Sequence, residues 1–165
     1  MKENTCCFTG HRVISPIDAE PLKLLLRGEI DRQIALGKSV FCCGGALGFD
    51  TLAAEAVLEA RERHSHIKLL LFLPHKGQAD SWREIDKKVY RSILDRADGV
   101  SYACEEYVNG CMFTRNRRLC DASSTCIAFL DHGSGGTFYT VKYARQNGLE
   151  IVNLAKKLRG IENEN

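Results

Sequence analysis

The sequence lacks a long hydrophobic run and a strong excess of charge of either sign. Its longest apolar run, residues 69–74, spans six residues, whereas a membrane-spanning helix needs about 20. The N-terminus carries no apolar signal region, so a cytoplasmic protein with no membrane contact is expected. Lysine and arginine total 23 against 21 aspartates and glutamates. The resulting net charge of +2 argues against a general binder of polyanions.

The eight cysteines also lack the spacings of common metal sites. No Cys-x-x-Cys motif occurs, and no histidine stands at zinc-finger spacing from a cysteine pair. Four of the cysteines form adjacent pairs inside apolar runs, at 6–7 and 42–43. Because 165 residues can bury a core without cross-links, cysteine acts here as a small hydrophobic residue. We therefore expect buried free thiols and no metal site.

Apolar segments of two different periodicities alternate along the chain. Short β-rich runs predict strands at 5–9, 39–43, 67–73, 100–103, 125–130 and 150–154. Between them, apolar residues at spacings of three and four predict helices. The first has Pro21 in its first turn and stops at Gly37. The others cover 46–64, a segment from Trp82 to about residue 98, 111–123 and 136–147.

This alternation predicts a single α/β domain over residues 1–155. Strands that alternate with helices form βαβ units, so we expect a Rossmann-like, doubly wound, mostly parallel sheet with helices on both faces. Residues 156–165 are mainly polar, and we expect a frayed C-terminal tail there. In folds of this class, ligands bind beyond the carboxyl ends of the strands. The candidate site should therefore lie in the strand-to-helix loops.

Three of these loops, at 9–12, 44–50 and 133–137, carry residues suited to an anionic ligand. Glycines let backbone N–H groups approach a phosphate at the positive end of a helix. Arg12 can bind a phosphate or carboxylate with two hydrogen bonds. Asp50 either caps its helix or holds a ribose hydroxyl. Each loop is also explained by an ordinary turn, and the loop at 44–50 matches neither the dinucleotide-binding nor the P-loop glycine pattern.

Two further segments add polar and aromatic side chains to the candidate site. Arg115 and Asn116 could point into the cleft, although a run of basic residues is usually an exposed helix face. Trp82 could stack on a base or simply support the third helix. The candidate ligand-binding residues are Thr9, Gly10, His11, Arg12, Gly44, Gly45, Gly48, Asp50, Gln78, Trp82, Arg115, Asn116, Ser134, Gly135, Gly136 and Thr137.

Together these motifs resemble the SLOG superfamily, a Rossmann-like group that joins the Smf/DprA DNA-processing proteins to the LOG cytokinin-activating enzymes. The resemblance covers residues 5–153 and is greatest to the YpsA-like branch of bacterial proteins. It rests on the segments 6–12, 44–50, 77–82, 110–117 and 135–137. It implies that the chain binds a nucleotide derivative. It also implies a homodimer as a candidate assembly, because members of the superfamily commonly form dimers.

The LOG branch carries an enzymatic alternative. Its phosphoribohydrolases remove the base from a nucleoside 5′-monophosphate, with an arginine in Met-x-x-Arg-Lys and a glutamate in Gly-Gly-x-Gly-Thr-x-x-Glu. This sequence keeps the arginine as Arg115, but Thr140 stands at the glutamate position. The carboxylate that would activate water is missing there. A hydrolase would need Asp50 or Glu55 as a relocated acid.

The DprA branch carries a second alternative, because its domain binds single-stranded DNA and helps load a recombinase. Segments 44–50, 115–117 and 134–136 resemble that branch too. Single-strand binding needs a basic track with stacking aromatics, and this chain has one tryptophan and a net charge of only +2. We therefore expect a sensor or carrier that binds a small nucleotide or ADP-ribose-like ligand. No cofactor beyond that ligand is predicted.

Overall fold

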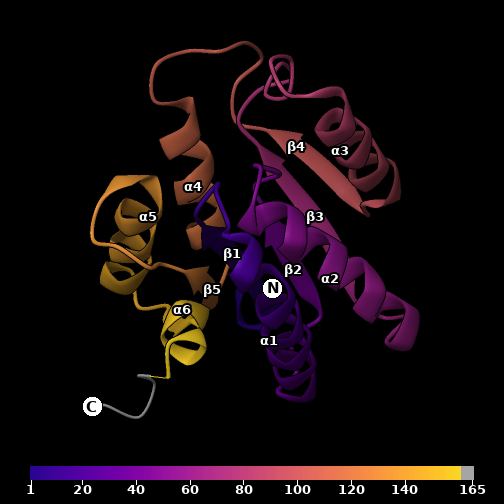
Figure 1. The fold of residues 1–165 in the computed structure, drawn as a ribbon, viewed down its shortest axis with the longest axis vertical. Helices are drawn as coiled ribbons and strands as arrows, with labels where there is room; N and C mark the ends of the chain where they lie inside the picture. Colours follow the sequence, from indigo (N-terminus) through magenta and orange to yellow (C-terminus); the bar gives the residue numbers. More distant parts are fainter. Residues whose placement is uncertain (161–165) are drawn as a thin grey trace.

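A parallel β-sheet runs through the centre of the computed structural model, which describes residues 1–160 (Figure 1). The strands are β1 (Thr5–Gly10), β2 (Val40–Cys43), β3 (Lys68–Leu73), β4 (Gly99–Tyr102), β5 (Thr125–Phe129) and β6 (Glu150–Asn153). They lie in the order β4-β3-β2-β1-β5-β6, and every neighbouring pair is parallel. This arrangement confirms the predicted Rossmann-like α/β fold.

Helices cover both faces of the sheet, as a doubly wound fold requires. They are α1 (Pro16–Ala35), α2 (Phe49–Arg63), α3 (Glu84–Arg96), α4 (Cys111–Asp121), α5 (Gly135–Gln146) and α6 (Leu154–Leu158), and a short 3-10 helix, η1, spans Lys2–Asn4. Cys6 and Phe8 of β1 pack with the helices α1, α2 and α6. Cys7, which points the other way, packs with α4 and α5. Because alternate residues of β1 serve two cores, this strand is apolar on both sides.

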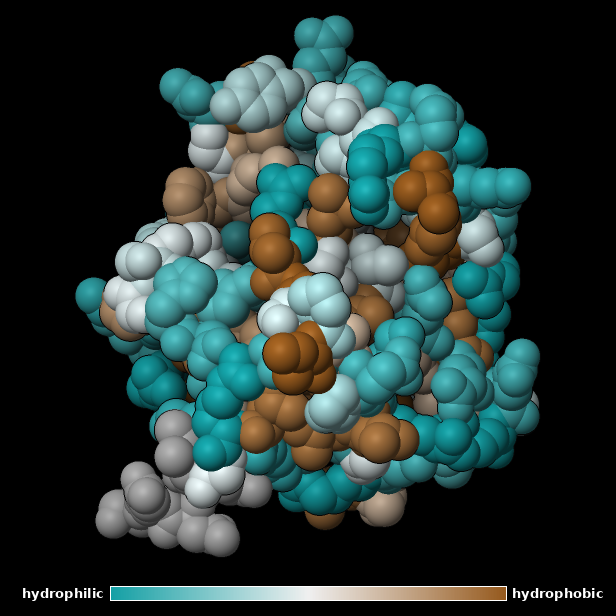
Figure 2. Space-filling view, in the orientation of Figure 1, coloured by the Kyte–Doolittle hydropathy of each residue, from teal (hydrophilic) through white to brown (hydrophobic). Residues whose placement is uncertain are grey.

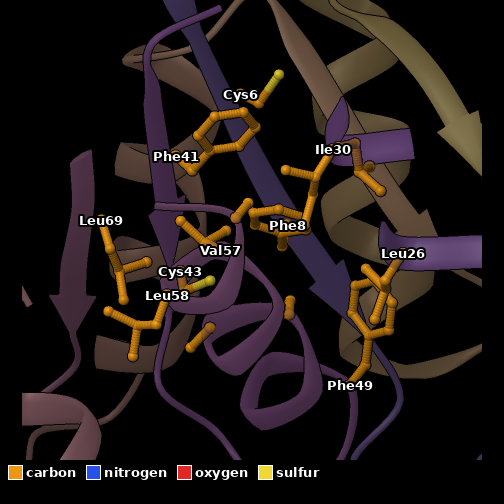
Figure 3. Close-up of a cluster of buried hydrophobic side chains, with 14 of the residues drawn as sticks. Cys6, Phe8, Leu26, Ile30, Phe41, Cys43, Phe49, Val57, Leu58 and Leu69 are labelled. Atoms are coloured by element: carbon orange, nitrogen blue, oxygen red, sulfur yellow. The ribbon is translucent and has the colours of Figure 1, made fainter. Parts of the chain in front are cut away.

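The larger core is built around phenylalanine rings from β1, β2 and the start of α2 (Figure 3). The ring of Phe8 lies 6.1 Å from that of Phe41 and 6.3 Å from that of Phe49, measured between centroids. All eight cysteines are free and all but Cys104 are buried, which confirms the expectation of buried thiols. Burial raises the pKa of the Cys6 and Cys42 thiols to about 12, so both stay protonated at neutral pH.

Two helices differ from their predictions. Helix α1 begins at Pro16, so Pro21 lies inside it and not in its first turn. The missing N–H of Pro21 would bond to the carbonyl of residue 17, so only one hydrogen bond near the helix start is lost. Helix α3 begins at Glu84, and Trp82 lies in the preceding turn, where its ring packs edge-on against Tyr90 at 5.1 Å.

Helix α6 was not predicted, and it falls partly within the segment expected to fray. Asn153 caps this helix by accepting a hydrogen bond from the backbone N–H of Ala155 (3.1 Å). Lys157 forms an ion pair with the buried Glu29 of α1 at 3.5 Å. Residues 156–160 are therefore attached to the domain, and the rest of the predicted tail, 161–165, lies outside the described residues.

The visible surface in Figure 2 is mainly hydrophilic, with hydrophobic residues gathered near its centre, over the region of α1 and β1 in Figure 1. Two strongly exposed apolar side chains are Val13, in the loop before α1, and Ile17, at the start of α1. Within residues 1–160, no helix combines the length and the apolar character needed to cross a membrane.

Candidate functional site

A cavity of about 630 Å³ opens at the carboxyl ends of β1 and β5. Starting from β1, the chain adds β2, β3 and β4 along one edge of β1. It then returns and adds β5 and β6 along the opposite edge of β1. The loops after β1 and β5 therefore diverge and leave a crevice between them, which is where ligands bind in open α/β sheets. The register pairs Gly10 with Phe129 at its base.

Most of the predicted site residues meet in this cavity. Eleven of the sixteen candidates line it: Thr9, Gly10, His11, Arg12, Asp50, Arg115, Asn116, Ser134, Gly135, Gly136 and Thr137. The lining is completed by Phe8, Val13, Ser15, Asp18, Ala46, Met112, Phe129, Asp131, His132 and Arg159. The structure thus brings together residues of the predicted loops at 9–12 and 133–137 and of α4.

The glycines of the second loop lie next to the cavity and not in its lining. Gly44 accepts a hydrogen bond from Nη1 of Arg115 through its carbonyl oxygen, and a Cβ at Gly44 would lie 2.5 Å from that nitrogen. The carbonyl oxygen of Gly45 accepts a hydrogen bond from Nε2 of Gln78 (3.2 Å). A Cβ at Gly48 would overlap the carbonyl oxygen of Arg12. These glycines allow close packing behind the cavity.

A buried aspartate forms part of the cavity wall at the start of α2. Asp50 is 6% exposed, and its Oδ2 accepts a hydrogen bond from the backbone N–H of Ala46 (3.1 Å). The predicted capping role needs correction, because the N-cap of α2 is Gly48 and Asp50 lies within the first turn. The bond from Ala46 is the only hydrogen bond of the Asp50 side chain within residues 1–160.

A buried arginine lies near this aspartate. Arg115 is 5% exposed, its Nε donates to Oδ1 of Asn116 (2.7 Å) and its Nη2 contacts the sulfur of Met112 at 3.7 Å. Burial lowers the pKa of its guanidinium, while the charge of Asp50 acts in the opposite direction. The cavity lining therefore includes a buried cation from α4 and a buried acid from α2.

Burial raises the pKa of Asp50 to about 6, although Arg115 and the N–H of Ala46 both favour its ionised form. Because this pKa exceeds that of the unfolded chain, ionisation of Asp50 costs stability as the pH rises through 6. We expect Asp50→Asn to raise the free energy of unfolding by about 2 kcal/mol at pH 7.5. The gain should disappear below pH 4, where Asp50 is protonated in both states. Urea unfolding at several pH values would measure it, and a loss of stability at pH 7.5 would contradict it.

Two histidines join the loops on either side of the crevice. The rings of His11 and His132 are stacked, with centroids 4.0 Å apart and planes 7° apart. Nε2 of His11 accepts a hydrogen bond from the backbone N–H of Asp131 (2.8 Å), which requires that nitrogen to be unprotonated. Burial, and secondarily His132, lower the pKa of His11. A neutral His11 therefore links the β1–α1 loop to the β5–α5 loop.

The comparisons with known proteins place this chain in a family. Residues 16–154 match the family model of the YspA SLOG family (YpsA). The chain belongs to the YspA SLOG family. A UPF0398 protein of Bacillus thuringiensis (strain Al Hakam) is 30% identical over 137 residues, which cover 81% of this chain and 74% of the relative. A UPF0398 protein of Halalkalibacterium halodurans is 34% identical over 79 residues, 48% of this chain and 42% of the relative.

Solved structures of DNA processing protein A share the fold of this YspA SLOG protein. The Helicobacter pylori protein, studied for its single-stranded DNA binding mode, has a TM-score of 0.65 and 19% identity, and the match covers 91% of this chain and 64% of that one. The Streptococcus pneumoniae protein has a TM-score of 0.62 and 18% identity over 90% and 49% of the two chains. This chain therefore spans 64% of the first neighbour and 49% of the second.

The cavity of the YspA SLOG domain is also lined by residues that were not predicted from the sequence. Arg159, beyond α6, donates to both carboxylate oxygens of Asp18 (2.8 Å each) and lies 2.6 Å from Oδ2 of Asp131. These ion pairs join the C-terminal segment, α1 and the β5–α5 loop at the mouth of the cavity. Asp131 and His132 directly follow β5, so the rule that ligands bind after strand ends could have identified them.

In the YspA SLOG fold, the remaining site candidates and the two candidate acids differ in whether they face the cavity. Gln78 and Trp82 lie outside the cavity lining, and Gln78 contacts Gly45 and Tyr90. Thr140 is 1% exposed, and its hydroxyl donates to the carbonyl of Gly136 (2.9 Å). Glu55 lines a separate hollow between α1, α2 and α3. Of the carboxylates considered, Asp50 is the one in the cavity.

The outer faces of α4 and α5 carry an exposed aromatic pair. The rings of Phe113 and Tyr139 meet edge to face at 4.8 Å, and Nη1 of Arg117 donates to the Tyr139 hydroxyl (3.0 Å). The same two helices contribute to the cavity lining. Within residues 1–160, no group of three or more His, Cys, Asp or Glu side chains is arranged to hold a metal ion.

Proposed function

We propose that the cavity between β1 and β5 binds a small nucleotide or nucleotide-derived ligand such as ADP-ribose, and that the protein acts as a sensor or carrier of that ligand. The observation that carries this proposal is the meeting of three chemically suited elements at one topological switch point. They are a glycine-rich helix start, a buried cation and a buried acid. The cavity volume of about 630 Å³ lies within the range of small-molecule sites, about 300–1,000 Å³.

The start of α5 is suited to the phosphates. Ser134, Gly135, Gly136 and Thr137 line the cavity at the N-terminal end of a helix of 12 residues, where backbone N–H groups and the helix dipole favour an anion. No Cβ contact would hinder a side chain at Gly135 or Gly136, so the open space there is available to a ligand. Arg12, on the facing loop, adds a positive charge.

A thermal-shift and calorimetry screen against AMP, ADP, ATP, ADP-ribose and NAD tests the proposal. A ligand at 100 times its Kd adds about 2.7 kcal/mol, equivalent to a shift of about 5–10 °C for a domain of this size. We expect Thr137→Val to weaken binding about fivefold or more, because the change removes one hydroxyl donor to a phosphate oxygen. Thr140→Val, on the same helix but outside the lining, is the matched control. Equal affinities for both variants would count against the phosphate position.

Single-stranded DNA binding is a second candidate, favoured by the exposed Phe113–Tyr139 pair with Arg117 beside it. Stacking aromatics next to a cation are typical of single-strand binding surfaces, and the Helicobacter pylori neighbour is described as a single-stranded DNA binder. A short oligonucleotide belongs in the same screen, at low salt. If it alone shifts the melting temperature, and Arg117→Ala reduces the shift, the DNA-binding function replaces the small-ligand function.

A nucleotide N-glycosidic hydrolase is a third candidate, because Asp50 supplies a cavity carboxylate that Thr140 does not. Chromatography of AMP after incubation with the protein would detect free adenine. Release that is lost in Asp50→Asn would establish this activity. Unchanged AMP together with a clear thermal shift would support binding without catalysis.

A further inference from the structure

We propose that Asp50 makes this cavity selective for ribonucleotides over 2′- or 3′-deoxyribonucleotides, by accepting a hydrogen bond from a ribose hydroxyl. This inference rests on the proposed function and deepens it, because it names the sugar that the site recognises. It would also separate a ribonucleotide ligand from a DNA ligand at the same cavity.

The hydrogen bonds of Asp50 leave one acceptor free. Its Oδ2 accepts from the N–H of Ala46 (3.1 Å), and this is the only hydrogen bond of the Asp50 side chain within residues 1–160. The side chain is nevertheless 94% removed from solvent, since 6% remains exposed, and it lines the cavity. Oδ1 is not among the fully buried side-chain atoms that lack a partner within residues 1–160, so it is open to the cavity, while the residue as a whole is largely removed from water. A ligand that brings a donor to Oδ1 therefore gains more affinity there than at an exposed acceptor.

The charge of the side chain decides which donor fits. An anionic carboxylate repels a phosphate placed against it, so the phosphates belong at the start of α5, which is separated from Asp50 by β1. A hydroxyl carries a proton and no charge, and it forms a strong hydrogen bond to an ionised acceptor. The positive charge of Arg115 favours the ionised form of Asp50, so the carboxylate can remain buried beside a neutral sugar.

The order of the strands places the two ends of the ligand. Asp50 follows β2 and the start of α5 follows β5, and β1 lies between these strands. Two strand spacings of about 4.8 Å put the two loops roughly 10 Å apart. A ribose 5′-phosphate can span that distance once a hydrogen bond of about 3 Å is counted at each end. The sugar hydroxyls then lie at Asp50 when the phosphate lies at Gly135 and Gly136.

The test measures affinity for AMP and ADP and for their 2′-deoxy and 3′-deoxy forms by calorimetry at pH 7.5. We expect the wild type to bind the ribose form about tenfold more tightly than at least one deoxy form, the effect of one hydrogen bond to an ionised group. In Asp50→Asn this ratio should fall below about threefold. Glu55→Gln, on the same helix but facing another hollow, should keep the wild-type ratio.

The outcomes separate the two proposals. If the wild type binds ribose and deoxy forms equally, or if Asp50→Asn keeps the tenfold ratio, selectivity through Asp50 is wrong while nucleotide binding stands. If no nucleotide binds the wild type, both proposals fail together. The ratio in the wild type needs no variant, so the test remains decisive even if a substitution disturbs folding. A thermal melt of each variant confirms that it is folded.

Discussion

Arg115→Ala lowers the free energy of unfolding by about 3 kcal/mol at pH 7.5, the loss expected when a buried charged side chain and its hydrogen bond to a buried carbonyl are removed. Arg115 is 5% exposed and donates to the carbonyl of Gly44. Its removal leaves that carbonyl without the bond and removes the cation that most favours the ionised form of Asp50. The same change should also weaken nucleotide binding, because a cation is lost from the cavity lining.

The pH dependence identifies the electrostatic part of this loss. Without Arg115, the pKa of Asp50 rises above its value of about 6, so ionisation near neutral pH costs more than in the wild type. At pH 5 Asp50 is largely protonated in both proteins, and the difference between them should shrink. It should also shrink in an Asp50→Asn background. Arg117→Ala, on the exposed face of the same helix, is the control and should change stability little. A loss that is constant from pH 5 to pH 8 would show that packing alone is responsible.

Gly48→Ala lowers the free energy of unfolding by about 4 kcal/mol, the range of the most damaging single substitutions. Gly48 has a φ of 76°, in the region where L-residues are strained. A Cβ there would overlap the backbone carbonyl of Arg12, which cannot rotate away as a side chain can. The next residue, Phe49, donates its N–H to the carbonyl of His11 (3.1 Å). The substitution therefore forces the β1–α1 loop away from α2.

A matched control separates the cost of a positive φ from the cost of a Cβ that overlaps neighbouring backbone atoms. Gly135 also has a positive φ, 89°, but a Cβ there meets no atom within 4 Å. Gly135→Ala should therefore cost about 1 kcal/mol, the price of the backbone conformation alone. Urea unfolding of both variants, checked against the circular dichroism of the native state, gives the comparison. Equal losses at the two positions would falsify the view that Gly48 is required by close backbone contact.

The sheet could be predicted from sequence because its strands are short, apolar runs with clear ends. Cys6, Cys7 and Phe8 face two cores, and such a strand occurs only in a sheet covered on both faces. Strand order, in contrast, depends on how distant segments pair, and periodicity contains no information about that. Helix α6 was missed because five residues with two lysines show no amphipathic period. Its capping by Asn153 and the Lys157–Glu29 ion pair depend on contacts across the fold.

The candidate site could be predicted in outline because parallel strands end at one edge. This rule found the loops that contain Arg12, Asp50 and Thr137. It did not distinguish glycines that face the cavity from glycines that pack behind it. The need for glycine at 44 comes from its close contact with Arg115, which lies 71 residues away in the sequence. Arg159 could not have been found, because its partner Asp18 is 141 residues distant. Such pairs are set by tertiary geometry and have no local signature.

The central position of β1 has a consequence for how the protein is made. Residues 5–10 leave the ribosome well before their second neighbour in the sheet, β5, which begins at Thr125. Until β5 has been synthesised, β1 is the open edge of a sheet, and its side chains are apolar on both faces. Such an edge promotes pairing between chains. We therefore expect chains truncated before Thr125 to aggregate, and we expect a nascent chain to bind its ligand only after β5 and α5 have emerged.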